Sequence, residues 1–382
     1  SFTPTVKINF SEYFSTGELA MNTGYKSGKQ ISLATFFSFA IIALFVSGNV
    51  LSQLEPINQR PNPFSTVDHW ATLPDGREWG STAGVDMDPD GRHLWAIDRC
   101  GTNSCIGSTV DPIVKIDPSG NVVASIGGGL MLFPHGLHVD RDGNIWVTDG
   151  QGPREDNPAT AGMGHVVYKL SPEGEVLLTL GQPGVAGDGT DALLETPCDV
   201  VTDADGNIYV GDGHSGQNPD ATASTVARIV KFDREGNLLK YWGGWGSEAG
   251  KLKTPHALDI DSRNRLIVGD RGNNRLQIFD LNGNYIGEFK SFSRPSGIYI
   301  SEDDIIYVAD SESEFDDTRN PGWHAGIRVG SLLDGIVDYF IDGTVEAYPA
   351  GSNPEGVAVD SAGNVFGAVV SDGGALVKSA RR

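Results

Sequence analysis

The sequence is poor in cysteine, in basic charge and in helical pattern. It has 3 cysteines among 382 residues, and 28 lysines and arginines face 50 aspartates and glutamates, which gives a net charge of −22. Phosphate backbones repel a protein of this charge, so nucleic acid is not expected as a partner. Long amphipathic helical patterns are absent, whereas glycine (50 residues) and Asp/Gly turns are abundant. This balance favours an all-β fold of many short strands.

Several chemical signatures are absent as well. The sequence has no phosphate-binding glycine loop, no Ser-His-Asp spacing and no stripe of alternating basic and aromatic residues. Such patterns would have indicated nucleotide binding, a serine nucleophile or binding of single-stranded nucleic acid. The functional residues therefore have to be sought outside these motifs.

A long apolar run, residues 31–46, follows two lysines and the methionine Met21. A basic start, an apolar run and small residues near Ser52 are typical of a secretory signal peptide, which we place at 21–52. The alternative is an uncleaved membrane anchor, for which the run is slightly short. Residues 1–20 precede this segment and are not expected to belong to the fold.

Export implies an oxidising compartment, so we expect a secreted or periplasmic protein that is free of the membrane after signal cleavage. Cys100 and Cys105 lie close together in RCGTNSC and could close a small disulfide loop. Cys198 would then be left over.

Internal repetition is the strongest signal in the sequence. Each repeat contains a strand, an Asp/Gly turn and a second strand, and most repeats continue with another such pair. A four-stranded sheet cannot bury both faces alone, but six such sheets stacked around an axis can, so we predict a six-bladed β-propeller over 65–382. The last repeat lacks a clear fourth strand, which residues 65–73 could supply. The first halves of the repeats read TAGVDMDPDGRHLWAIDR, FPHGLHVDRDGNIWVTDG, TPCDVVTDADGNIYVGDG, TPHALDIDSRNRLIVGDR, RPSGIYISEDDIIYVADS and NPEGVAVDSAGNVFGAVV.

The repeat register brings one residue of each blade to the same mouth of the channel. This residue follows the proline at the start of the innermost strand, and the loops between second and third strands lie on the same face. His135, His256 and Glu355 occupy alternate blades, so an approximate three-fold axis points two imidazoles and a carboxylate at one spot. Such a set suits zinc with an open position, and also iron or manganese. The full ring reads Ala83, His135, Cys198, His256, Ser296 and Glu355.

Each ring residue also has a plainer interpretation. An isolated histidine is more often a hydrogen-bonded polar residue than a metal ligand, and Cys198 is more simply a small buried thiol. Three metal-capable residues at equivalent positions of alternate blades are a much less probable coincidence, which favours a metal site.

The repeats resemble NHL repeats over nearly all of residues 65–382. Within that class, FPHGL…WVTD, TPHAL…GDRGNNRLQIF and RIVKFDREGNLLKYWG look like the peptidyl-α-hydroxyglycine α-amidating lyase family. That resemblance implies three histidine ligands for the metal. His135 and His256 match the first two, whereas Glu355 stands in the place of the third.

The resemblance implies further roles. Val85 and Leu137 match residues whose backbone carbonyls bind a calcium ion in the channel, but Gly356 stands where the family has an aspartate ligand. Arg99 and Arg271 match arginines that face the substrate, where guanidinium groups could hold a carboxylate or stabilise an oxyanion. Their alternative role is to pair with aspartates between blades. The family's catalytic tyrosine falls near His214, which could act as a base or be a solvated loop residue.

Three functions remain open at this stage. The first is a metal-dependent lyase, with zinc as the expected metal and calcium as a second ion, that splits an α-hydroxyglycine compound. The second is a metal-dependent propeller hydrolase such as a lactonase, which the carboxylate of Glu355 favours. The third is a non-catalytic NHL module that binds a peptide or glycan. For the enzymes we expect a small-molecule or peptide substrate, and in each case a monomer.

Overall fold

The Asp/Gly turns close their hairpins through the aspartate side chain. The carboxylate of Asp140 accepts the peptide N–H groups of Asp142 (3.0 Å) and Asn144 (2.9 Å), and Gly143 takes a φ of 84°. Glycine reaches this left-handed conformation without steric cost. The same pair of bonds recurs at Asp203, Asp233 and Asp280. The repeated DGN pattern therefore encodes the same local hairpin again and again.

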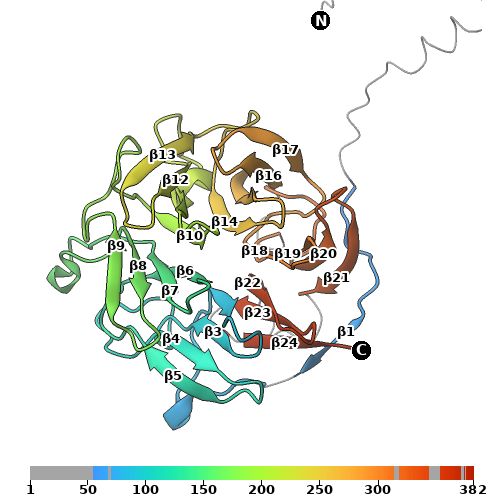
Figure 1. Ribbon diagram of the computed structural model, residues 1–382, viewed down its shortest axis with the longest axis horizontal. Helices are drawn as coiled ribbons and strands as arrows, with labels where there is room; N and C mark the ends of the chain where they lie inside the picture. The colour runs from blue at the N-terminus through green and yellow to red at the C-terminus, as the bar shows by residue number, and fades with distance from the viewer. Residues whose placement is uncertain (1–54, 68–69, 314–317, 344–352, 371–373, 375) are drawn as a thin grey trace, which may run out of the picture. The chain divides into compact units, whose positions relative to one another are not determined.

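The computed structural model describes residues 55–67, 70–313, 318–343, 353–370, 374 and 376–382. The predicted signal peptide at 21–52 and residues 1–20 lie outside the described residues. Within the unit Leu54–Arg382, six four-stranded antiparallel sheets are arranged as the blades of a propeller (Figure 1). The all-β, six-bladed fold predicted from the repeats is confirmed.

Each of the first five blades runs in chain order from its inner to its outer strand. Blade one comprises β2 (Val85–Met87), β3 (Leu94–Ile97), β4 (Ile113–Ile116) and β5 (Val122–Ile126). Blade two comprises β6 (Pro134–Val139), β7 (Ile145–Asp149), β8 (Val166–Leu170) and β9 (Val176–Leu180). Blade three comprises β10 (Pro197–Thr202), β11 (Ile208–Asp212), β12 (Arg228–Phe232) and β13 (Leu238–Gly243).

Blade four comprises β14 (Pro255–Ile260), β15 (Arg265–Asp270), β16 (Arg275–Asp280) and β17 (Tyr285–Phe289). Blade five comprises β18 (Gly297–Ile300), β19 (Ile305–Asp310), β20 (Gly326–Ser331) and β21 (Val337–Asp342). Short 3₁₀ turns occur at η1 (Pro74–Gly76), η2 (Pro158–Thr160), η3 (His214–Gln217) and η4 (Arg271–Asn273). Among the described residues, no helix is both long and apolar enough to cross a bilayer.

Blade six joins the two ends of the propeller. Its strands β22 (Pro354–Val359), β23 (Val365–Val369) and β24 (Leu376–Arg381) come last in the chain, and β1 (Phe64–Val67) pairs with β24 as the outermost strand. The expectation that a segment near residues 65–73 closes the ring is confirmed, although the strand begins one residue earlier and ends at Val67. The inner strands β22 and β2 are in contact, so the ring is complete.

The chain just before β1 also contacts the propeller. The carbonyl of Ile57 accepts a bond from Arg328 (3.2 Å), that of Pro61 from the N–H of Phe340 (3.3 Å), and that of Pro63 from Arg382 (2.9 Å). These bonds lead the entering chain along blades five and six to the position of β1.

The apolar core consists of layers between neighbouring blades. One layer contains Phe64 of β1, which is 4% exposed, with Tyr307 and Ile327 of blade five and Val357 and Val365 of blade six. The closing strand therefore contributes a side chain to the core as well as main-chain hydrogen bonds.

Phe64→Ala tests this closure. We expect the free energy of unfolding, measured by denaturant titration, to fall by about 3–5 kcal/mol, because the change leaves a cavity in the layer. Val123→Ala is the matched control, since Val123 lies on the outer strand β5 and is 54% exposed, and it should cost less than about 0.5 kcal/mol. Equal small losses in both variants would show that β1 does not hold the ring closed.

Candidate active site at the channel mouth

A buried aspartate at the end of the second strand holds the loop that enters the inner strand. Asp149 accepts the N–H groups of Leu132 (3.0 Å) and Phe133 (2.7 Å), the two residues before Pro134. Asp212 and Asp270 do the same in blades three and four. In blade one, Asp98 directly follows the second strand and accepts the N–H of Gly80, and in blade five Asp310 ends the second strand and accepts the N–H of Arg294. All five aspartates are fully buried. Burial raises the pKa of Asp149 to about 6, although its two N–H bonds favour the charged form.

A β-bulge then turns the next residue out of the ladder. The register between first and second strands shifts after the proline in blades two, three, four and six. A bulge leaves the extra residue unpaired and redirects its side chain. The residues at these shifts are the ones that follow proline, namely His135, Cys198, His256 and Glu355.

All six ring positions line one cavity on the propeller axis, with a volume of about 50 Å³. The structure thus brings His135, His256 and Glu355 together, as the repeat register predicts. The cavity is also lined by Val85 and Leu137, the residues expected to offer carbonyls to calcium.

His214 joins this group as a third imidazole. The ring centroids of His135, His214 and His256 lie 4.7–5.2 Å apart, and one ligand atom from each lies within 4.8 Å of the other two. Three imidazoles at this separation could hold one metal ion between them. The sequence placed His214 only loosely near the mouth, because the loop that carries it is longer than that of the family it resembles.

Short backbone contacts place His214. Its N–H donates to the Thr196 carbonyl (3.2 Å) and hydroxyl (2.8 Å), just before the inner strand of blade three. The preceding Gly213 has a φ of 132°, and a Cβ there would lie 2.2 Å from the Val226 carbonyl oxygen, so only glycine fits. His214 lies two residues beyond the buried Asp212, an offset that could have been read from the sequence.

Two hydrogen bonds fix the orientation of the other imidazoles. Nδ1 of His135 donates to the Cys198 carbonyl (2.8 Å), and Nδ1 of His256 donates to the Ser296 carbonyl (2.7 Å). A carbonyl oxygen can only accept, so Nδ1 carries the hydrogen and Nε2 of a neutral ring presents its lone pair. Backbone partners of this kind are typical of metal-binding histidines. Nε2 of His256 is buried without a hydrogen-bond partner among the described residues.

Glu355 lies against both rings. Its Oε1 is 3.1 Å from Nε2 of His135 and 3.9 Å from Nε2 of His256. Burial would raise the pKa of Glu355, but the contact with His135 and the positive charge of Arg99 outweigh it and hold the pKa well below its usual range. A carboxylate oxygen and an imidazole lone pair repel at 3.1 Å unless a proton or a cation lies between them. A proton on Nε2 of His135 would satisfy this contact, and so would a divalent metal bound between the two groups, which the set of nitrogen and oxygen donors also fits.

Arg271 contacts the histidine cluster directly. Its Nη2 lies 3.2 Å from Nε2 of His214 and 3.4 Å from Oε1 of Glu312, and its own side chain is 1% exposed. Burial first, and then the charge of Arg271, lower the pKa of His214 to about 3. His214 is therefore a neutral ring, which suits a ligand better than a base that works near neutral pH.

Arg99 is held at the opposite side of the mouth by a small disulfide loop. Its Nε donates to the Pro134 carbonyl (3.0 Å), its Nη1 to Asn103 (2.8 Å), and its guanidinium stacks 3.8 Å from the Phe133 ring centroid. Cys100 and Cys105 form a disulfide that encloses Asn103. Nη2 of Arg99 is buried and has no hydrogen-bond partner among the residues that the structure describes. Burial lowers the pKa of Arg99 to about 10.

Two further residues, Cys198 and Asp199, line the same cavity. Cys198 is fully buried, and burial raises the pKa of its thiol well above the usual value, in keeping with a packed thiol. The family's aspartate beside Glu355 is replaced by Gly356, and Asp199 of blade three also lines the cavity. The carboxylate of Asp199 accepts the N–H groups of Val200 (2.9 Å) and Leu258 (2.8 Å). Burial raises the pKa of Asp199 to about 7.

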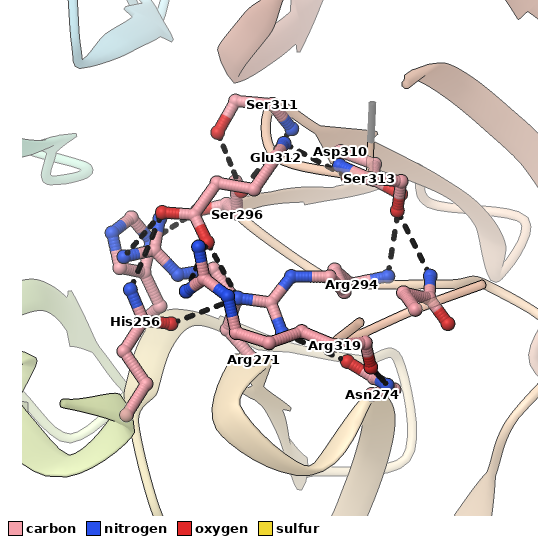
Figure 2. A network of polar contacts seen from close by, with 12 residues as sticks. His256, Arg271, Asn274, Arg294, Ser296, Asp310, Ser311, Glu312, Ser313 and Arg319 are labelled. Carbon is pink, nitrogen blue, oxygen red and sulfur yellow. Dashed lines mark hydrogen bonds and ion pairs between the residues drawn. The ribbon is translucent and has the colours of Figure 1, made fainter. Parts of the chain in front are cut away.

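Sequence reasoning missed Arg294, which is 1% exposed and bonds Glu312 and Gln217 at the rim. It lies directly before the ring proline of blade five, and Glu312 lies two residues beyond Asp310, the same offset that places His214. Figure 2 shows Arg271, Arg294 and Arg319 around Glu312, with His256 nearby.

The fold and this mouth define a six-bladed β-propeller with a polar, metal-capable site on its axis. The NHL repeat family matches residues 252–279 of the chain. The sequence is 33% identical over 160 residues to "NHL repeat-containing protein 3" of Mus musculus, a match that covers 40% of this chain and 41% of that protein. Residues 252–279 thus match an NHL repeat within a six-bladed propeller.

More particularly, the chain is similar to amidating lyases. It is 27% identical over 243 residues to the "Probable peptidyl-alpha-hydroxyglycine alpha-amidating lyase pgal-1" of Caenorhabditis elegans, which covers 63% of this chain and 59% of that protein. A gluconolactonase of Xanthomonas campestris shares the fold, with a TM-score of 0.53 at 15% identity over 86% of this chain and 97% of that one. The two sequence matches, to the mouse and the Caenorhabditis elegans proteins, thus cover only 41% and 59% of the length of these relatives.

His256→Ala tests the metal-binding role of the cluster. We expect purified protein loaded with zinc to lose stoichiometric metal, measured by elemental analysis, because the buried Nε2 is removed from the centre of the site. His214→Ala should weaken zinc binding by at least about tenfold, since it removes one of three nitrogen donors.

His93→Ala is the matched control, because His93 lies on a surface turn where it bonds Asp90. It should leave the zinc content unchanged. Full zinc occupancy in His256→Ala would contradict the proposed ligand set.

Proposed function

We propose that the protein is a metal-dependent lyase that cleaves an α-hydroxyglycine compound, peptidyl or smaller, into an amide and glyoxylate. The observation that carries this proposal is the convergence of three imidazoles and one carboxylate between two buried arginines. The similarity to amidating lyases supports it.

His135, His214 and His256 would hold the metal, and Glu355 would complete the set as an oxygen ligand. Zinc is the metal we propose, since nitrogen donors and one open position are its usual catalytic environment. The bound metal would supply Lewis acidity toward the substrate hydroxyl. Nε2 of His214 accepts a bond from Arg271, so His214 would offer its other ring nitrogen to the metal.

Arg99 and Arg271 would bind the substrate carboxylate. Each has a buried nitrogen with no hydrogen-bond partner within the described part of the chain, Nη2 in Arg99 and Nε in Arg271. Guanidinium groups bind carboxylates strongly, and in a buried site they discriminate sharply against neutral groups. The disulfide loop would keep Arg99 in place, which agrees with an exported, secreted or periplasmic protein.

We extend the proposal to a calcium ion in the cavity below the histidines. The carbonyls of Val85 and Leu137 and the carboxylate of Asp199 would be its ligands, since calcium prefers oxygen donors. Asp199, which belongs to blade three, would supply the carboxylate ligand that Gly356 lacks.

A metal-dependent hydrolase, such as a lactonase, is the second candidate. The observation in its favour is Glu355, which brings a carboxylate into the ligand set and lowers the net charge of the site. The third candidate is a non-catalytic propeller that binds a peptide or glycan. If the purified protein binds no metal, this candidate is favoured over both enzymes.

Arg271→Gln tests the lyase. With N-benzoyl-α-hydroxyglycine as substrate we expect the zinc-loaded wild type to release glyoxylate, measured colorimetrically. The variant should lose about 100-fold in kcat/KM, because one guanidinium no longer meets the carboxylate. Arg234→Gln, on an exposed Asp/Gly turn, should keep the wild-type value.

One outcome would decide against the lyase, and another against the role of Arg271. Absence of glyoxylate release together with hydrolysis of a lactone would favour the second candidate. An Arg271→Gln variant with wild-type kcat/KM would remove the assigned role of that arginine.

A further inference from the structure

A carboxylate of the protein itself lies among the arginines at the rim of the histidine cluster. Glu312 follows β19, and its Oε2 accepts hydrogen bonds from Arg294 and, at 3.3 Å, from Nη1 of Arg319. Its Oε1 lies 3.4 Å from Arg271 and accepts a bond from Gln217 (3.3 Å). Figure 2 shows Arg271, Arg294 and Arg319 around this carboxylate.

Two of the arginines around Glu312 are more buried than Glu312 is. The side chains of Arg271 and Arg294 are each 1% exposed, against 23% for Glu312. Buried cations are almost always paired, and among the described residues these two guanidiniums share the carboxylate of Glu312. In the part of the chain that the structure describes, Nε of Arg271 and Nε of Arg294 are both buried without a hydrogen-bond partner. The group is therefore built to bind an anion and carries more positive charge than Glu312 neutralises.

One guanidinium connects this group to the candidate active site. Nη2 of Arg271 contacts both His214 and Glu312, so only the guanidinium of Arg271 separates the carboxylate of Glu312 from the imidazole of His214. A ligand carboxylate that binds Arg271 beside the histidines would meet the negative charge of Glu312 on the same guanidinium.

We propose that Glu312 is a specificity-determining residue that fills, with its own carboxylate, an anion pocket formed by Arg271 and Arg294, so that a substrate carboxylate must compete with it. The inference rests on the proposed function in that the substrate carries a carboxylate, but it does not depend on which bond is cleaved. Glu312 thereby sets how tightly the mouth holds anionic relative to neutral ligands.

Glu312→Gln tests the competition, because glutamine keeps the shape and a hydrogen-bonding oxygen but removes the charge. The probes are glycolate and its neutral amide, glycolamide, titrated calorimetrically into metal-free full-length protein at fixed ionic strength. We expect glycolate to bind Glu312→Gln about tenfold more tightly than the wild type. The affinity for glycolamide should not change.

Glu288→Gln is the matched control. Glu288 is 26% exposed and bonds the buried Arg275, as Glu312 bonds Arg294, but it lies on the outer strand β17. It removes the same charge from the protein and should leave glycolate affinity at the wild-type value. A thermal-shift measurement gives a second readout: glycolate should raise the melting temperature of Glu312→Gln more than that of the wild type, because it replaces the lost counter-charge.

Equal glycolate affinity in the wild type and Glu312→Gln would overturn the inference, and so would an equal gain in Glu288→Gln. Both readouts measure binding alone. A protein that releases no glyoxylate but shows the expected gain would therefore refute the proposed reaction and leave the role of Glu312 intact.

Discussion

The structure depends on the buried aspartate that ends the second strand of a blade. Its carboxylate binds the N–H groups of the residues that lead into the inner strand, and this bond fixes where the inner strand begins. The residue that follows the proline is thereby carried to the axis in every blade where the pattern holds. Because the aspartates are fully buried, their loss would leave peptide groups unsatisfied in the interior, which is costly. One local interaction thus serves both the fold and the site.

The β-bulge and the backbone carbonyls of the next blade set the direction of the histidine rings. The bulge turns His135 and His256 toward the channel, and the carbonyls of the next blade, at Cys198 and Ser296, orient the rings through Nδ1. The imidazoles therefore present lone pairs toward Glu355, a geometry that only a proton or a cation between them makes favourable. Neighbouring blades position each other's functional groups, so the site exists only when the ring is closed.

The repeats predict a large part of this arrangement. Four-strand periodicity gave the six blades, the closing segment was correctly located near β1, and the proline register brought His135, His256 and Glu355 to one place. His214 was predicted near the mouth from the family resemblance. Its approach to His135 and His256 was not predicted, because the loop that carries it departs from the repeat. Arg294 and the charge pairing of Glu312 were missed for a related reason: ion pairs between different blades have no period in the sequence. Their offsets from proline and from the second-strand aspartate were nevertheless visible.

The most direct test of the account is an X-ray experiment on crystals of zinc-loaded protein, with anomalous data collected at the zinc absorption edge. The account predicts a strong anomalous peak on the channel axis within coordination distance, about 2.0–2.2 Å, of nitrogens from His135, His214 and His256. A map without a peak at that position, or a zinc ion bound elsewhere with the three imidazoles hydrogen-bonded among themselves, would contradict it.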